Sequence, residues 1–345
     1  MMAATMREGK QAGFSLVELM VGMVLGLMLI AGAVSIYLAS KRSYVEVEQV
    51  AALTESARFA EQLVGDSLRH AGFFGEVSPN SINKDSNLSI VGGDCDGDAG
   101  AHDLSQFVYA VTAPSAPPGT SVSVLDCIDD AMPNTDVLVI KHVASQPYTD
   151  GRRDSFDPND PSQSDGVIDT PDVLQNDKTY VLTNNITGIM FDGNDTVPSK
   201  QVPGGTAWEY QYEVFYIRNA AIPQLSRKVL NWNGTAMELV TEDIAEGVEN
   251  LRVSLGYDSN SDGEVDTFKT PAEVLSAGKW SDVQSVEVFM LTRSATKDVQ
   301  YTDEKTYRLA GSDVEPDPDK KNYRRLVSYA SVSLRNLKLI MRGGA

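Results

Sequence analysis

The sequence predicts an α+β protein, with a long N-terminal helix packed on a mainly antiparallel, β-rich globular head. Two observations predict the helix. The apolar run of residues 14–40 has the length of a membrane span, and no proline occurs before Pro79, so one helix can extend to Ala71. A third observation predicts the head, because beyond residue 73 short β-prone segments follow one another without helices long enough for parallel crossovers.

The first half of this helix, residues 14–40, can span a bilayer, which takes about 20 apolar residues. Glu18 is its only side chain that is charged at neutral pH. A carboxylate near one end of a membrane-length helix is costly and therefore needs a functional reason. A short polar leader, residues 1–13, carries Arg7 and Lys10 before the apolar run.

Two ordinary interpretations compete for this segment. A secretory signal peptide would be cut at Ala31-Gly32-Ala33, but its apolar region would then contain Glu18, and the run continues to Leu38. A plain single-span anchor would place Glu18 at the membrane interface. The mature N-terminus separates the alternatives, since the signal peptide predicts Val34 and the anchor predicts Met1 or Met2.

The second half of the helix, residues 41–72, is amphipathic. Its apolar residues recur at intervals of four and three, so they form one stripe that is expected to lie on the head. Gly72 is a plausible C-cap. The stripe consists of Leu53, Ala57, Ala60, Val64 and Leu68.

The head, residues 73–345, reads as a series of strands between turn residues. Along 210–216, aromatic and apolar residues alternate with Gln211 and Glu213, which predicts a sheet buried mainly on one face. The predicted strands are residues 107–111, 121–125, 136–143, 179–183, 210–218, 224–230, 248–257, 283–292 and 326–334.

Composition excludes two functional classes. The 345-residue chain has a formal net charge of −19, which disfavours nucleic acid as a partner. Its three histidines, His70, His102 and His142, lie in no catalytic motif, and neither a P-loop nor a dinucleotide fingerprint is present. We therefore expect no enzymatic activity.

One acidic loop resembles a cation site. Residues 258–266 place oxygen ligands at the first, third, fifth, seventh and ninth positions of an EF-hand-like loop, with Gly263 at the sixth. The twelfth position is Lys269 rather than Glu, so a complete EF-hand is not expected. Two interpretations stay open: a Ca²⁺ loop with fewer ligands, or an Asx-rich turn without metal. The candidate ligands are Asp258, Asn260, Asp262, Glu264 and Asp266.

The stretch Gly13-Phe14-Ser15-Leu16-Val17-Glu18, behind its short charged leader, resembles the class III signal of type IV prepilins and type II secretion pseudopilins. The resemblance implies that a prepilin peptidase cuts after Gly13 and that Phe14 becomes the methylated N-terminus. It also implies an assembly role for Glu18, whose carboxylate would pair with the free amine of a neighbouring subunit's N-terminal Phe.

Later segments resemble the PilW minor pilins. The end of the helix contributes residues 55–60 and 68–73, and the C-terminal half contributes residues 244–251, 283–294, 323–326 and 333–336. The resemblance implies a minor pilin that joins an inner-membrane or tip complex and primes type IV pilus assembly. The alternatives are a minor pseudopilin of a type II secretion system and a pilus-tip adhesin.

The same resemblance implies location and partners. The chain is expected in the inner membrane, as a single-pass protein with its C-terminal head in the periplasm, and then in the pilus at the cell surface. Its partners would be other minor pilins, the major pilin, the prepilin peptidase, the inner-membrane assembly platform and, through residues 14–40, the lipid bilayer. In the oxidising periplasm Cys95 and Cys127 are expected to form a disulfide.

Overall fold

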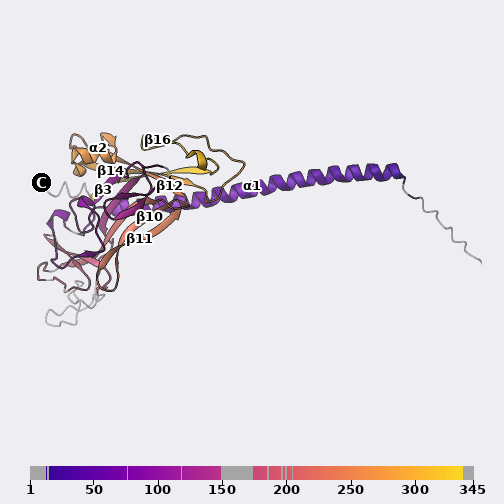
Figure 1. Ribbon diagram of the computed structural model, residues 1–345. Coiled ribbons are helices and arrows are strands. Elements are labelled where there is room, and N and C mark those ends of the chain that lie inside the picture. Colours follow the sequence, from indigo (N-terminus) through magenta and orange to yellow (C-terminus); the bar gives the residue numbers. More distant parts are fainter. Residues whose placement is uncertain are drawn as a thin grey trace, which may run out of the picture. The chain divides into compact units, whose positions relative to one another are not determined.

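A computed structural model describes residue 13 and residues 15–75, 77–117, 119–148, 174–184, 186–195, 197–198, 200–203 and 205–336 (Figure 1). The leader up to residue 12, Phe14 and the chain end from residue 337 lie outside these residues. The chain divides into two compact units between Ala51 and Ala52, and each unit is described by itself.

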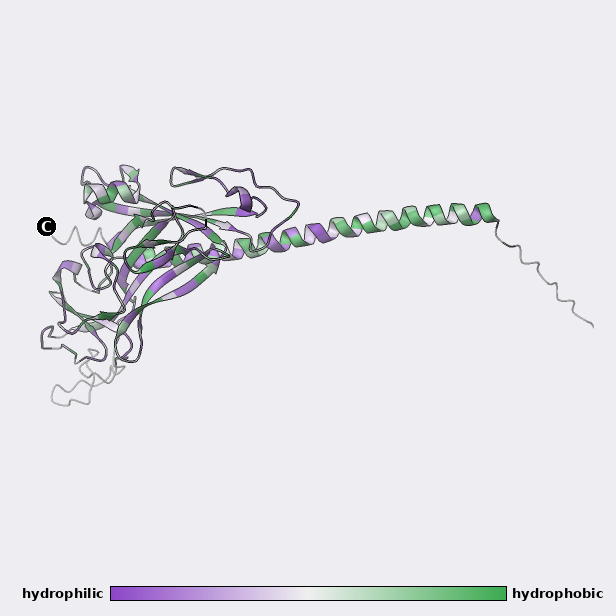
Figure 2. Ribbon diagram, viewed as in Figure 1, coloured by the Kyte–Doolittle hydropathy of each residue, from purple (hydrophilic) through white to green (hydrophobic). Residues whose placement is uncertain are grey.

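Helix α1 runs without interruption from Leu16 to His70, as the absence of proline predicts. In the first unit its apolar side chains are exposed; for example, Leu29 is 76% exposed. Figure 2 shows the N-terminal portion of α1 as mostly hydrophobic, with hydrophilic turns farther along the helix. By length and composition, this part of the helix could cross a membrane.

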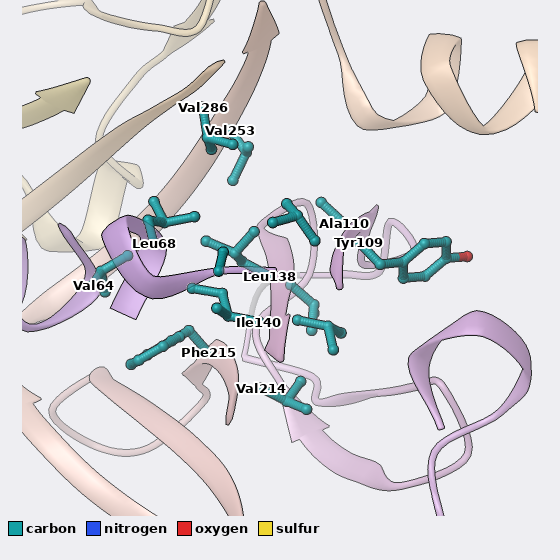
Figure 3. Packing of buried hydrophobic residues seen from close by; sticks show 14 of the residues in the cluster. Val64, Leu68, Tyr109, Ala110, Leu138, Ile140, Val214, Phe215, Val253 and Val286 are labelled. Carbon is teal, nitrogen blue, oxygen red and sulfur yellow. The ribbon is translucent and has the colours of Figure 1, made fainter. Parts of the chain in front are cut away.

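In the second unit the amphipathic stripe of α1 is buried, as predicted. Ala57, Ala60, Val64 and Leu68 are each at most 1% exposed. Figure 3 shows Val64 and Leu68 in one hydrophobic cluster with residues from both main sheets, including Leu138. Burying such apolar side chains is the main stabilising contribution to the head, at about 25 cal/mol per Å² removed from water.

The helix ends because the chain turns at Gly72, whose φ of +75° is favourable only for glycine. The Gly72 N–H donates to the Lys141 carbonyl at 3.0 Å, which attaches the helix end to a strand of the head. The predicted C-cap is therefore confirmed in position.

Two main sheets and one two-stranded sheet form the described head. The larger is 11-stranded, and most of its pairs are antiparallel; β1 with β8 and β2 with β11 are parallel. It contains β1 (Ile82–Lys84), β2 (Ile90–Val91), β3 (Val108–Thr112), β4 (Val122–Val124), β5 (Ile128–Ala131), β6 (Asp136–Val143), β7 (Thr179–Thr183), β8 (Gly188–Asp192), β9 (Thr206–Arg218), β10 (Gln224–Trp232) and β11 (Met237–Glu246).

The smaller sheet is wholly antiparallel, in the order β13-β12-β14-β17. Its strands are β12 (Val248–Tyr257), β13 (Thr267–Lys269), β14 (Val283–Arg293) and β17 (Arg325–Ser333), and a separate hairpin joins β15 (Tyr307–Leu309) to β16 (Ser312–Val314). Helix α2 (Pro271–Ala277) begins with a capping box between Thr270 and Glu273. Short 3₁₀ turns are η1 (Pro79–Ser81), η2 (Gly97–Ala99), η4 (Trp280–Asp282) and η5 (Pro318–Lys320).

The prediction that the sheet around β9 is buried mainly on one face is wrong. Every residue from Tyr212 to Ile217 is buried, Glu213 included. One face of the strand lies toward the core stripe of α1. The other face is covered by the loop of residues 94–103, where the Tyr212 hydroxyl donates a hydrogen bond to the Ala99 carbonyl. A period-2 pattern cannot reveal a loop from another part of the chain that closes the second face.

Candidate functional site

The predicted assembly residue Glu18 lies in the first turn of α1. The Ser15 N–H donates to Glu18 Oε2 at 3.0 Å, and the Glu18 N–H donates to Ser15 Oγ at 3.2 Å. This reciprocal pair is a capping box, which satisfies two backbone N–H groups at the start of the helix. Because no water is available in the bilayer core to replace such bonds, a cap of this kind matters more at the edge of lipid than in solution.

Glu18 therefore has two physical roles open to it. Its carboxylate stabilises the positive end of the helix dipole, and it remains exposed to any cation that approaches. Gly13, the residue before the predicted cleavage, is exposed. Phe14, the predicted mature N-terminus, lies outside the described residues.

The candidate cation loop is a network of Asx turns. Asp258 accepts hydrogen bonds from the backbone N–H groups of Asn260, Ser261 and Gly263, between 2.6 and 3.2 Å. Asp266 accepts from the N–H and hydroxyl of Ser259. The described residues contain no group of three or more acidic, His or Cys side chains placed to hold a metal. The Ca²⁺ site stays a prediction.

The twelfth position of that loop has a different contact. Lys269 Nζ lies 3.5 Å from the centroid of the Tyr257 ring, a cation–π contact. This residue therefore packs on the strand before the loop, which is consistent with the absence of a complete EF-hand.

The predicted cysteine pair attaches a second acidic segment, residues 94–103, to the turn between β4 and β5. Cys95 and Cys127 form a disulfide with a Cα–Cα separation of 4.8 Å. Within the loop, Asp94 accepts hydrogen bonds from the N–H groups of Cys95 and Ala101. The Tyr210 hydroxyl donates to the Ala101 carbonyl, so the loop is attached to β9 as well as through its disulfide.

The same loop surrounds a buried ammonium group. Lys141 on β6 is fully buried, and its Nζ donates to the carbonyls of Asp98 and Asp103. Burial lowers the pKa of Lys141 to about 8, although the carboxylates of Asp103 and Asp94 oppose this. The side chain of Lys141 thus supplies this acidic segment with a cation from the protein itself.

Two family models match the chain. The model described as "Type IV Pilus-assembly protein W" matches residues 214–336, which run from β9 to just beyond β17. The model described as "Prokaryotic N-terminal methylation motif" matches residues 9–34, including Gly13, Phe14 and Glu18. The chain is PilW-like. Both parts of the resemblance found in the sequence, at the N-terminus and in the C-terminal half, are confirmed.

The PilW-like chain also matches a solved structure, a type IV-like pilin from Thermus thermophilus. The identity is 12%, the TM-score is 0.23, and the match covers 47% of this chain and 86% of that one. A TM-score of this size does not establish a common fold. No curated protein matches the chain.

Three of the motif segments that mark the PilW-like region meet at one carboxylate. Glu249, at the start of β12, pairs with Arg325 at the start of β17 and lies 3.8 Å from Arg293 Nε at the end of β14. Arg325 also pairs with the fully buried Asp303 at 3.1 Å. These charges lie within the match of the PilW model, and their geometry indicates a structural role, joining the strands of the smaller sheet.

The histidines of this PilW-like protein have structural surroundings. His70 Nδ1 lies 2.9 Å from the Asp66 carbonyl at the end of α1. His142 Nε2 lies 3.8 Å from Glu213 Oε2. Burial lowers the pKa of His102 to about 4, and its Nε2 has no hydrogen-bond partner. The pilin families that the chain resembles consist of structural proteins.

Sequence reasoning missed two residues that organise these sites. Ser15 carries a readable signal, because Ser-x-x-Glu before an apolar run is a capping-box pattern. Lys141 carries none. It lies in an apolar strand, 38 residues from the nearest carbonyl it binds, so only the folded chain brings the two together.

Proposed function

We propose that this chain is a minor pilin that primes type IV pilus assembly after cleavage between Gly13 and Phe14. The observation that carries the proposal is the start of α1, where one capped carboxylate, Glu18, precedes a long helix face of exposed apolar side chains. Such a face is stable only when lipid or other apolar helices cover it. The methylation-motif match over residues 9–34 supports cleavage at this place.

In this proposal the helix changes its surroundings once. Residues 14–40 first anchor the chain in the inner membrane, with the head in the periplasm, and then pack among the helices of other pilins. The apolar core of the bilayer offers Glu18 no charge partner, whereas a neighbouring subunit offers the amine of its N-terminal Phe. A charge pair shielded from water is much stronger than an exposed pair, so Glu18 would set the position of one subunit against the next.

The experiment separates processing from assembly. Glu18→Val should be cut normally, with Phe14 at the mature N-terminus, but should fail to enter pili. The measurement is N-terminal sequencing of the membrane fraction, together with immunodetection in sheared pili. Normal piliation with the variant incorporated would refute the role of Glu18, and an uncut N-terminus in the native chain would refute the cleavage.

A minor pseudopilin of a type II secretion system would have the same N-terminal cleavage motif, apolar helix and Glu. Deletion of the gene distinguishes the two systems, since the proposal predicts loss of pili and twitching with secretion intact. A tip adhesin would instead keep assembly intact and lose binding to a surface.

A further inference from the structure

The turn between β10 and β11 presents the dipeptide Asn233-Gly234 on a fixed frame. The two strands pair up to Trp232 and Met237, and the Asn233 N–H donates to the Ala236 carbonyl at 3.1 Å. Asn233 and Gly234 are both exposed at the tip of this hairpin. The dipeptide is therefore in contact with water while the paired strands hold its conformation.

Three donors hold the side-chain amide of Asn233. Its Oδ1 accepts from the Thr235 N–H at 3.0 Å, from the Thr235 hydroxyl at 2.9 Å and from the Ala236 N–H at 3.1 Å. These bonds form an Asx turn, which folds the amide back over the peptide bond that follows it. Donors on a carbonyl oxygen stabilise the negative charge that develops there when a nucleophile adds to the carbon, as in an oxyanion hole. The turn thus activates Asn233 Cγ toward attack.

The nucleophile nearest to this carbon along the chain is the backbone nitrogen of Gly234. Its N–H donates to no acceptor among the residues that the structure describes, so no hydrogen bond has to break before the nitrogen loses its proton. Gly234 has a φ of +100°, and no atom lies within 4 Å of the position a Cβ would occupy, so nothing obstructs the approach. Attack within one chain also avoids the entropic cost of bringing two molecules together.

From these contacts we propose that Asn233 is a self-modification site, at which the Gly234 nitrogen converts the side-chain amide into a carboxylate. The nitrogen attacks Cγ, the new N–Cγ bond closes a succinimide ring, and the Cγ–Nδ2 bond breaks. The proton lost by the Gly234 nitrogen passes through water to Nδ2, which leaves as ammonia. One water molecule then hydrolyses the ring at either carbonyl and leaves Asp or isoaspartate at position 233, with no change in oxidation state.

The product would change the end of the hairpin. Asn233 Nδ2 donates to Glu238 Oε2 at 3.3 Å, and a carboxylate at position 233 replaces this hydrogen bond with repulsion between like charges. Glu238 and Met237 are also the residues of β11 that pair with β2. We therefore expect modification to weaken the attachment of β2. The inference goes beyond the proposed function and does not depend on it, because the reaction needs no partner protein.

Peptide-mapping mass spectrometry of the detergent-solubilised full chain tests the site. The protein is incubated at mildly alkaline pH in water enriched in heavy oxygen, so that each modification during the incubation carries the isotope. Asn231, exposed on the same hairpin but followed by Trp232, is the internal control. We expect Asn233 to react about tenfold faster than Asn231, and about tenfold faster in the folded chain than in urea, because only the folded turn supplies the three donors. A rate at Asn233 that is no higher in the folded chain than in urea would overturn the proposal.

Two substitutions at Thr235 test the contribution of its hydroxyl. Thr235→Val removes the hydroxyl but keeps the N–H, and should slow the modification about fivefold, the effect of one hydrogen bond. Thr235→Ser keeps the hydroxyl and should react at the native rate. Thermal melting checks that both variants are folded. The native rate in Thr235→Val, or equal slowing in both variants, would refute the assistance by the turn.

Discussion

The Ser15 N–H donates to the Glu18 carboxylate at 3.0 Å, so the lone charge of the apolar helix also caps that helix. Loss of Glu18 therefore removes two things at once: a negative charge and a hydrogen-bond acceptor at the helix start. An assembly defect in Glu18→Val alone does not show whether the lost charge or the lost hydrogen-bond acceptor causes it. The neighbouring serine offers a way to separate them.

We predict that Glu18→Gln fails to assemble and that Ser15→Ala assembles. Gln can still accept at the capping position but carries no charge, whereas Ser15→Ala keeps the charge and weakens the cap by about 1 kcal/mol. Both variants are compared by their amount in sheared pili, at equal levels of processed protein in the membrane. The reverse order, with Glu18→Gln assembling and Ser15→Ala failing, would assign Glu18 to capping alone.

The buried Lys141 predicts a pH dependence on the alkaline side. Its pKa is lowered to about 8 in the folded chain, below the unfolded value, so between pH 8 and the unfolded pKa the unfolded chain binds the extra proton. Stability from this group therefore rises with pH. Relative to Lys141→Met, the unfolding free energy of the native chain should rise by about 2 kcal/mol between pH 7.5 and 9.5.

Denaturant unfolding of the detergent-solubilised full chain measures this difference. Lys200→Met, at an exposed position, is the matched control and should follow the native chain at both pH values within about 0.5 kcal/mol. If the difference in unfolding free energy between the native chain and Lys141→Met stays constant or falls as the pH rises, the ammonium is not held in a desolvated site.

His102 predicts a pH dependence on the acid side. Burial lowers its pKa to about 4, so as the pH falls below about 6.5 the unfolded chain takes up a proton that the folded chain does not. Stability is lost on acidification. The unfolding free energy of the native chain should fall by about 2 kcal/mol relative to that of His102→Gln between pH 7 and pH 5. Chemical unfolding at the two pH values checks this, and parallel changes in both proteins would contradict it.

The acidic loop of residues 258–266 predicts a metal response that can be tested directly. If it binds Ca²⁺, adding millimolar Ca²⁺ should raise the melting temperature of the full chain, and Asp262→Ala should remove the increase, because ligand binding to the folded state stabilises it. Asp96→Ala, in the other acidic loop, is the matched control and should keep the increase. No increase in the native chain, or the same increase in Asp262→Ala, would leave the loop as a metal-free Asx turn.

Local patterns were sufficient for much of the fold. Helix α1 follows from an uninterrupted sequence without proline, and its buried stripe from apolar residues at intervals of three and four. Strands β6, β7 and β12 occur at the predicted residues. Each of these features depends on neighbours within a few positions along the chain. The predicted residues did not include β8 and β11, which formed through pairing with β7 and β10.

The sequence by itself determined the candidate membrane span, the candidate processing site at Gly13 and Phe14, and the position of Glu18, because these depend only on composition and close spacing. Tertiary structure decided the features that depend on contacts between residues far apart in the sequence. It buried both faces of β9, placed Lys141 among the carbonyls of an acidic loop, and left Trp280 Nε1 buried without an acceptor. The physical reason is that burial depends on which distant segment covers a side chain, and no local periodicity records that segment.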